Sequence, residues 1–212
     1  MVEGEQHLEV NEQNKIYILG GKGVGKTSFF HLLFEGNLSN VKPSKPGVVV
    51  SNFHKGNKVF TIKDLTDDDN FSKTKILIDE LEDVLLIFVL FAIDDRSSFK
   101  YAKNLIQFIK SNLINNKDLN IILVGNKQDI EENNPDKVQV KKTDVDHYIR
   151  DIENLYYKEI SCKTNFNFSK LKELIENIEI NEDNNEEDDD KIPEEERKKK
   201  VNDIKAGSCF IY

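Results

Sequence analysis

Short apolar runs alternate with stretches of helical spacing along most of the chain. The runs Lys15–Leu19, Val84–Ile93 and Asn120–Val124 predict strands that are covered on both faces of a sheet. Apolar residues recur at helical spacing over Ser98–Ile114 and Ser169–Ile180. This order predicts an α/β fold, with a mostly parallel six-stranded sheet, one antiparallel edge strand and about five flanking helices.

One pair of strands has a hairpin pattern. Gly56 and Asn57 lie between Gly47–Phe53 and Lys58–Ile62, and both residue types tolerate the positive φ angles that a tight turn requires. These two strands therefore supply the antiparallel pair. The remaining predicted elements are helices over Lys26–Phe34 and Thr143–Ile152 and a short strand over Tyr156–Ile160.

The apolar residues are unevenly distributed. Hydrophobic residues make up 38% of the 212 positions, which suffices for one core, but Asn181–Asp190 contains none. We therefore predict a folded domain over residues 15–180, a disordered extension over 1–14 and a disordered tail over 181–212. The longest apolar run is about half as long as the roughly 20 residues that span a bilayer.

Charge and cysteine content narrow the class of protein. The net charge of −9 argues against a protein that binds nucleic acid, and we expect a monomer. Cys162 and Cys209 are the two cysteines of the chain, which indicates a reducing compartment rather than a disulfide framework.

A phosphate-binding motif follows the first predicted strand. The segment GGKGVGKT, Gly20–Thr27, matches G-x-x-x-x-G-K-[ST] between a strand and a helix. Its backbone N–H groups can surround phosphates, Lys26 can reach the β and γ phosphates, and the Thr27 hydroxyl can bind Mg²⁺. The candidate phosphate-binding residues are Gly20, Gly21, Lys22, Gly23, Val24, Gly25, Lys26, Thr27 and Ser28.

A second motif favours guanine over adenine. The segment VGNKQD follows an apolar strand, and the Asp129 carboxylate can accept hydrogen bonds from guanine N1–H and N2–H₂. The Lys127 stem can lie on the base while Asn126 ties the loops together. An ATP-binding enzyme is disfavoured by Asp129.

With a third segment, Glu159–Lys163 (EISCK), these motifs resemble the small GTPases of the Ras superfamily over Lys15–Ile180. The resemblance, with a Rab-like GVGKTSFF, implies a P-loop small G domain that binds GTP or GDP with Mg²⁺ and hydrolyses GTP. It further implies exchange factors, activating proteins and effectors as partners. By resemblance, Ser161 and the Cys162 N–H would hold the guanine O6 loop, with Lys163 packing beside it. We expect the Cys162 thiol to be a buried filler rather than a redox sensor.

The second switch departs from the family pattern D-x-x-G-Q. Asp64 keeps the position that contacts Mg²⁺ through water, but Asp67 takes the glycine position and Asp68 the catalytic glutamine position. Carboxylates repel a γ-phosphate and no amide is left to orient water, so we predict slow hydrolysis and a preference for GDP. If the acidic loop instead turns into solvent, only the missing glutamine matters. The alternative function is a hydrolysis-deficient adaptor or scaffold.

Two other positions are unusual for the family. Lys22 stands where a small residue is common, so its ammonium either points toward the γ-phosphate or lies solvated at the rim. Ser44 is the candidate for the Mg²⁺-binding hydroxyl of the first switch, because it follows Pro43 and supplies a hydroxyl, although this chain has one extra residue before Gly47.

The chain ends in Cys209-Phe210-Ile211-Tyr212, which has the shape of a prenylation signal with an atypical last residue. Basic residues Arg197 to Lys200 precede it and would attract an anionic leaflet. We expect a lipid-anchored protein of the cytosol and the cytoplasmic face of a membrane, acting in vesicle traffic or signalling; the alternative is an unmodified Cys209.

Overall fold

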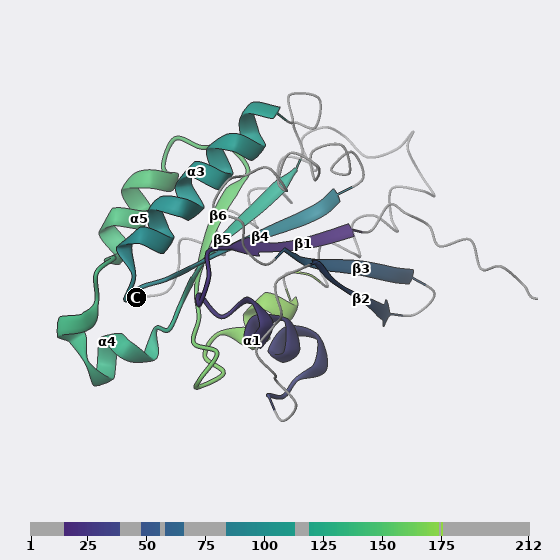
Figure 1. Cartoon of the computed structure of the whole chain (residues 1–212), viewed down its shortest axis with the longest axis horizontal. Helices are drawn as coiled ribbons and strands as arrows, with labels where there is room; N and C mark the ends of the chain where they lie inside the picture. The colour runs from purple at the N-terminus through teal and green to yellow at the C-terminus, as the bar shows by residue number, and fades with distance from the viewer. Residues whose placement is uncertain are drawn as a thin grey trace, which may run out of the picture.

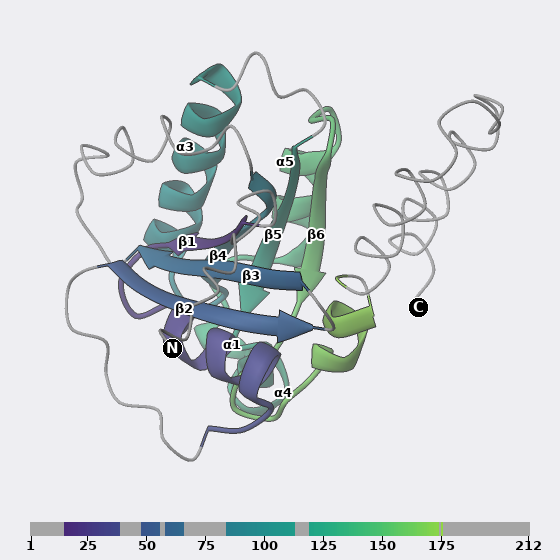
Figure 2. The same cartoon turned by 90° about the vertical axis from the view of Figure 1, so that its right-hand side faces the viewer.

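The computed structural model describes residues 15–38, 48–55, 58–65, 84–112, 119–173 and 175. A six-stranded sheet with the strand order β2-β3-β1-β4-β5-β6 forms its centre. Only β2 and β3 pair in antiparallel fashion, with β2 at the edge (Figure 2), which confirms the predicted sheet. The strands are β1 (Lys15–Gly20), β2 (Val48–Lys55), β3 (Lys58–Leu65), β4 (Val84–Ala92), β5 (Asn120–Asn126) and β6 (Leu155–Glu159).

Helices cover both faces of this sheet. The helices α3 (Arg96–Asn112) and α5 (Lys142–Ile149) lie on one face, and α1 (Lys26–Phe30) lies on the other (Figure 1). The C-terminal helix, described at 168–173 and 175, packs on the α1 face, where Phe168 and Leu171 are buried. The predicted helix Ser169–Ile180 thus begins at Phe168, and its end lies outside the described residues.

Alternation along the buried strands divides the core in two. In β1, Tyr17 and Leu19 join the cluster beneath α3 and α5, whereas Ile16 and Ile18 join the cluster beneath α1. Successive side chains of a strand point to opposite faces, so a continuous apolar run supplies both clusters. This is why the central strands have no polar alternation.

Helix α3 begins earlier than the predicted Ser98. Asp95 Oδ1 accepts hydrogen bonds from the backbone N–H groups of Ser97, at 2.9 Å, and Ser98, at 3.2 Å. A hydrogen bond from the Ser97 hydroxyl is the main cause that holds the pKa of Asp95 below its ordinary value, and the two backbone bonds add to it. The carboxylate satisfies the first free N–H groups of the helix, so the polar residues Arg96 and Ser97 are helical although they carry no apolar signal.

The predicted helix Lys26–Phe34 is divided. Its first part is α1, and His31–Glu35 forms a π-helical turn that ends at Gly36, where φ is +76°. The neighbouring residues Leu32 and Leu33 are both buried together with Phe29.

Other element boundaries also differ from the sequence-based expectation. The hairpin strands continue past Phe53 and Ile62, because cross-strand pairing runs to Lys55 and Leu65. Helix α5 ends at Ile149 rather than Ile152. The short helix α4 (Asp129–Asn133) and a 3₁₀ turn at Pro135–Lys137 were missed, since this polar stretch has no hydrophobic periodicity.

Within the described residues, no helix is long and apolar enough to cross a membrane. Several sequence-based predictions concern residues that lie outside the described part of the chain. These are the extension 1–14, Ser44, Gly56 and Asn57, Asp67 and Asp68, and the tail with Arg197 to Lys200 and Cys209.

Candidate nucleotide-binding site

The candidate site lies at the carboxyl ends of four parallel strands. The phosphate loop follows β1, Asp94 follows β4, Lys127 follows β5 and Ser161 follows β6. Parallel pairing in the order β1-β4-β5-β6 brings these ends to one edge of the sheet. Open α/β sheets bind ligands at this edge.

The phosphate loop is shaped by its backbone. Gly23 and Gly25 have φ angles of +75° and +97°, in the left-handed region that side chains disfavour. A Cβ on Gly25 would lie 2.4 Å from Asn126 Nδ2, so this position has both an angular and a steric reason to be glycine. The loop leads directly into α1, whose first N–H groups can bind an anion.

Lys26 is a buried cation in this loop. Its side chain lies at the start of α1, the residue is 5% exposed, and Nζ donates to the carbonyl oxygens of Gly20 and Gly21, both at 3.0 Å. These carbonyls compensate the cost of burying the ammonium group. The positive charge is thereby held at the mouth of the loop, where phosphates would lie.

The other candidate residues of the loop differ in exposure. Val24 is buried in the core beneath α1, and Lys22 is exposed. Thr27 and Ser28 are half-buried in the first turn of α1. Lys22 is therefore open to solvent, and its contact with a γ-phosphate stays a prediction.

Asn126 joins three segments of the site. Its Nδ2 donates to Val24 O at 2.8 Å, and its Oδ1 accepts from the N–H groups of Lys127, at 2.7 Å, and Cys162, at 3.1 Å. Asn126 is only 2% exposed. Because the amide supplies both donors and acceptors, one buried side chain links the phosphate loop to the ends of β5 and β6.

Asp129 is held as an oriented carboxylate. Its Oδ1 accepts from the Ser161 hydroxyl at 2.6 Å, and its Oδ2 lies 3.6 Å from Lys163 Nζ. The Asp129 side chain is 8% exposed, whereas that of Lys163 is 77% exposed. Ser161 Oγ also accepts from the Thr164 N–H at 3.2 Å, which orients the hydroxyl toward Asp129.

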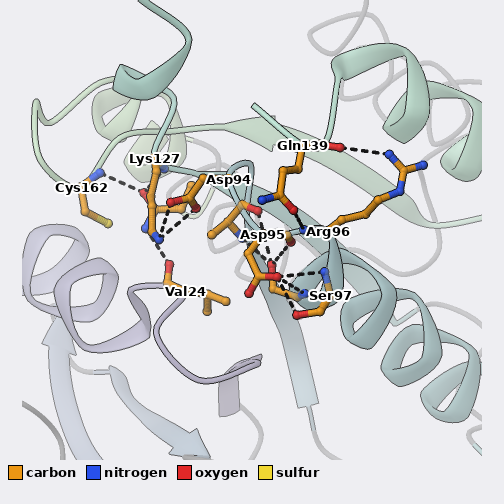
Figure 3. Close-up of polar contacts among 11 residues, drawn as sticks. Val24, Asp94, Asp95, Arg96, Ser97, Lys127, Gln139 and Cys162 are labelled. Carbon is orange, nitrogen blue, oxygen red and sulfur yellow. Dashed lines mark hydrogen bonds and ion pairs between the residues drawn. The ribbon is translucent and has the colours of Figure 1, made fainter. Parts of the chain in front are cut away.

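Lys127 follows Asn126 directly and lies in the same part of the site. Its backbone has a φ of +70°, and its Nζ donates to both oxygens of Asp94, at 2.9 and 3.1 Å (Figure 3). Asp94 is not among the site residues predicted from the sequence motifs. Its position directly after a buried parallel strand is the signal that could have identified it.

Cys162 is buried beside Asn126 and the phosphate loop. It is 8% exposed, and burial raises the pKa of its thiol to about 12. Its Sγ lies 4.0 Å from Gly25 O, and its N–H donates to Asn126 Oδ1. A neutral buried thiol suits the role of a small packing residue.

Two of the predicted Mg²⁺ ligands lie on elements that are each adjacent to β1. Thr27 is in the first turn of α1, and Asp64 of β3 pairs in register with Ile18 of β1. A hydroxyl and a carboxylate are hard oxygen ligands that suit Mg²⁺, which takes its other ligands from water and substrate phosphates. In the described part of the chain, no group of three or more His, Cys, Asp or Glu is placed to hold a metal ion.

The fold and this site define a P-loop nucleotide-binding domain of the α/β class. A family model described as "Ras family" matches residues 15–180, and the chain belongs to that family. It is accordingly a GTP-binding small GTPase. A search of curated proteins found no match.

Proposed function

We propose that the protein is a guanine-nucleotide switch with slow intrinsic GTP hydrolysis. The observation that carries the guanine part is the pair of fixed, opposite charges in one site. Lys26 presents a buried ammonium to the phosphate loop, and Asp129 presents an oriented carboxylate where the base would lie. A carboxylate recognises the N1–H and N2–H₂ donors of guanine and repels the acceptor edge of adenine.

In this proposal Lys127 and Asn126 complete the part of the site that holds the base, which we call the base side. Ser161 and Cys162 lie beneath this base side. The Lys127 stem stacks on the base, and Asn126 keeps the base side in register with the phosphate loop. When bound, Mg²⁺ supplies charge neutralisation for the β and γ phosphates; Thr27 and Asp64 are the described residues that would hold it, with Ser44 from the first switch.

The slow chemical step is inferred from the second switch. Asp67 and Asp68 replace the glycine and glutamine that the family pattern has after Asp64. Their charges oppose a γ-phosphate, and neither can act as a neutral amide that orients water. We therefore propose that the GDP form predominates and that Asp68 contributes little to hydrolysis.

The hydrolysis test compares two variants in a single-turnover assay. Wild-type protein loaded with GTP and Mg²⁺ should hydrolyse slowly, and Asp67→Gly combined with Asp68→Gln should hydrolyse at least about tenfold faster. Asp69→Asn removes a neighbouring charge without rebuilding the pattern and serves as the control. An unchanged rate in the double variant would contradict the role given to the second switch.

A second candidate function is a guanine-nucleotide-binding adaptor that does not hydrolyse GTP. The same two carboxylates favour it, since they remove the known means of positioning water. Undetectable turnover in the wild type, with turnover in the double variant, would select the adaptor over the switch.

The proposed site of action is the cytoplasmic face of a membrane, in vesicle traffic or signalling. Cys209 would carry a prenyl group, and the basic residues Arg197 to Lys200 would add attraction to anionic lipids. Exchange factors, activating proteins and effectors are the expected partners. Cys209→Ser should move the protein from the membrane fraction to the soluble fraction, with Cys162→Ser as the matched control; unchanged fractionation would contradict the anchor.

A further inference from the structure

The ion pair between Asp94 and Lys127 joins the guanine motif to Asp94, a residue outside the three sequence motifs. Both Asp94 oxygens accept from Lys127 Nζ, at 2.9 and 3.1 Å, and the two side chains are only 26% and 35% exposed. We propose that Asp94 is a positioning residue for nucleotide binding. Its carboxylate holds the Lys127 ammonium so that the aliphatic stem lies across the base pocket.

The backbone around Asp94 is anchored to the site. The preceding residue, Ile93, donates its N–H to Asn126 O at 3.1 Å, so the ends of β4 and β5 are joined directly before Asp94. Ile93 O accepts from Gln139 N, at 2.9 Å, and from Val140 N, at 3.0 Å. The N–H and the carbonyl of Ile93 are therefore both hydrogen-bonded, and these bonds fix the backbone directly before Asp94.

The following residue is equally constrained. Asp95 donates its N–H to Ala92 O at 3.0 Å, which closes a tight turn with Asp94 inside it. The Asp95 side chain caps α3 through Ser97 and Ser98 (Figure 3). The two adjacent carboxylates therefore have different hydrogen-bond partners. Asp95 caps α3, and Asp94 binds Lys127.

Lys127 is held at both of its ends. Its backbone N–H donates to Asn126 Oδ1 at 2.7 Å, and its φ of +70° fixes the direction in which the side chain leaves the backbone. The Asp94 carboxylate then fixes the ammonium. A long lysine side chain loses several rotamers on binding a base, so a lysine that is already ordered loses less entropy when the base arrives.

The competing interpretation is an ordinary surface ion pair with no bearing on nucleotide. Such pairs contribute little, because solvent screens them and both side chains stay mobile. The present pair differs in that one donor meets both carboxylate oxygens and both backbones are anchored. The two interpretations differ in their dependence on Lys127, which a double-mutant cycle measures.

The experiment measures the release of fluorescent methylanthraniloyl-GDP from the full chain after addition of excess GDP. Asp94→Asn, which keeps the shape but removes the charge, should release nucleotide roughly threefold to fivefold faster, as expected for a partly exposed ion pair. Lys127→Met keeps an apolar stem and removes the ammonium. In that background, Asp94→Asn should add no further acceleration, because Asp94 acts through the ammonium.

Two controls separate positioning from general effects. Asp95→Asn removes a charge one residue further on, which only weakly senses Lys127, and keeps a side chain that can cap α3, so it should change release far less than Asp94→Asn does. Asp94→Glu keeps the charge and should restore slow release. Asp94→Asn should also speed GDP and IDP release by the same factor, because stacking does not sense the 2-amino group that distinguishes these bases.

The inference rests on the proposed placement of the base beside Lys127, and its failure is distinct from failure of that proposal. Unchanged release in Asp94→Asn, or an equal acceleration in the Lys127→Met background, would overturn the role of Asp94 alone. A wild-type protein that does not retain methylanthraniloyl-GDP would overturn the guanine site together with it.

Discussion

The phosphate side and the base side of the site are built by different means. On the phosphate side, backbone conformation carries the geometry, through the left-handed glycines Gly23 and Gly25 and the carbonyl groups that hold Lys26. On the base side, the geometry is set by side chains, through the hydrogen bonds of Asn126 and Asp129. The first region can bind phosphates of any nucleotide, whereas the second can choose the base.

This difference predicts which changes alter affinity and which alter specificity. A change on the phosphate side removes binding of all nucleotides, since the phosphates are common to them. A change on the base side alters the ratio between guanine and adenine nucleotides. Asn126 belongs to both sides, so its loss affects affinity and stability together.

The largest expected effect belongs to Lys26. Lys26→Ala removes the buried ammonium that would contact the phosphates, and a charge-assisted contact of this kind is worth about 1.5–3 kcal/mol per hydrogen bond. GDP and ADP affinities should fall together, GDP by about a hundredfold or more. Isothermal titration measures both. The exposed Lys137→Ala, in the 3₁₀ turn, is the control. A loss confined to GDP would contradict the division between the two sides.

Asn126→Ala should weaken the link between the two sides. The change leaves Val24 O, Lys127 N–H and Cys162 N–H without their partner, and each unsatisfied buried group costs about 1–3 kcal/mol. We expect the free energy of unfolding to drop by about 3 kcal/mol or more, as judged by urea denaturation. Asn133→Ala, in the exposed α4, is the matched control. A stability equal to that of the wild type would show that the three bonds contribute little.

Asp129→Ala should change specificity more than stability. The variant loses the acceptor for the guanine N–H groups, so GDP affinity should fall while ADP affinity changes little, and their ratio should approach one. Competition against labelled GDP measures this ratio. Asp136→Ala, at an exposed aspartate of the nearby 3₁₀ turn, should leave it unchanged. Retained guanine preference in Asp129→Ala would place the base elsewhere.

The smallest expected effect concerns Cys162 and pH. Burial raises the pKa of this thiol to about 12, so the folded state favours the neutral form. The stability that the neutral thiol contributes is complete below the ordinary thiol pKa and is lost as pH rises through about 12. In a Cys209→Ser background, Cys162 should react slowly with a thiol reagent at pH 8, and unfolding in urea should restore ordinary reactivity. Rapid labelling of the folded protein would contradict its burial.

Much of the fold was predictable because most residues of β1, β4 and β5 are buried. The run from Val84 to Ala92 contributes side chains to both hydrophobic clusters of the core. A continuous apolar run of this kind is typical of a strand that is covered on both faces of a sheet. The early start of α3 was not predictable from periodicity, because the capping of Ser97 by Asp95 is a polar, local effect. Helix α4 was missed for the same reason, since Asp129–Asn133 has no apolar face.

The candidate site was predictable to the extent that it consists of contiguous motifs. Spacing alone pointed to Lys26, Asn126 and Asp129, because their motifs are short and continuous in sequence. Asp94 lies 33 residues from Lys127, and nothing in its own neighbourhood indicates the partner. Only the parallel pairing of β4 with β5 brings the two strand ends together.

The measurement that tests the account most directly is the affinity of the full chain for GDP, GTP and ADP, by competition against labelled GDP in the presence of Mg²⁺. The account predicts tight GDP binding, weaker GTP binding and ADP binding that is weaker still. ADP competing as well as GDP would contradict the guanine site formed around Asp129.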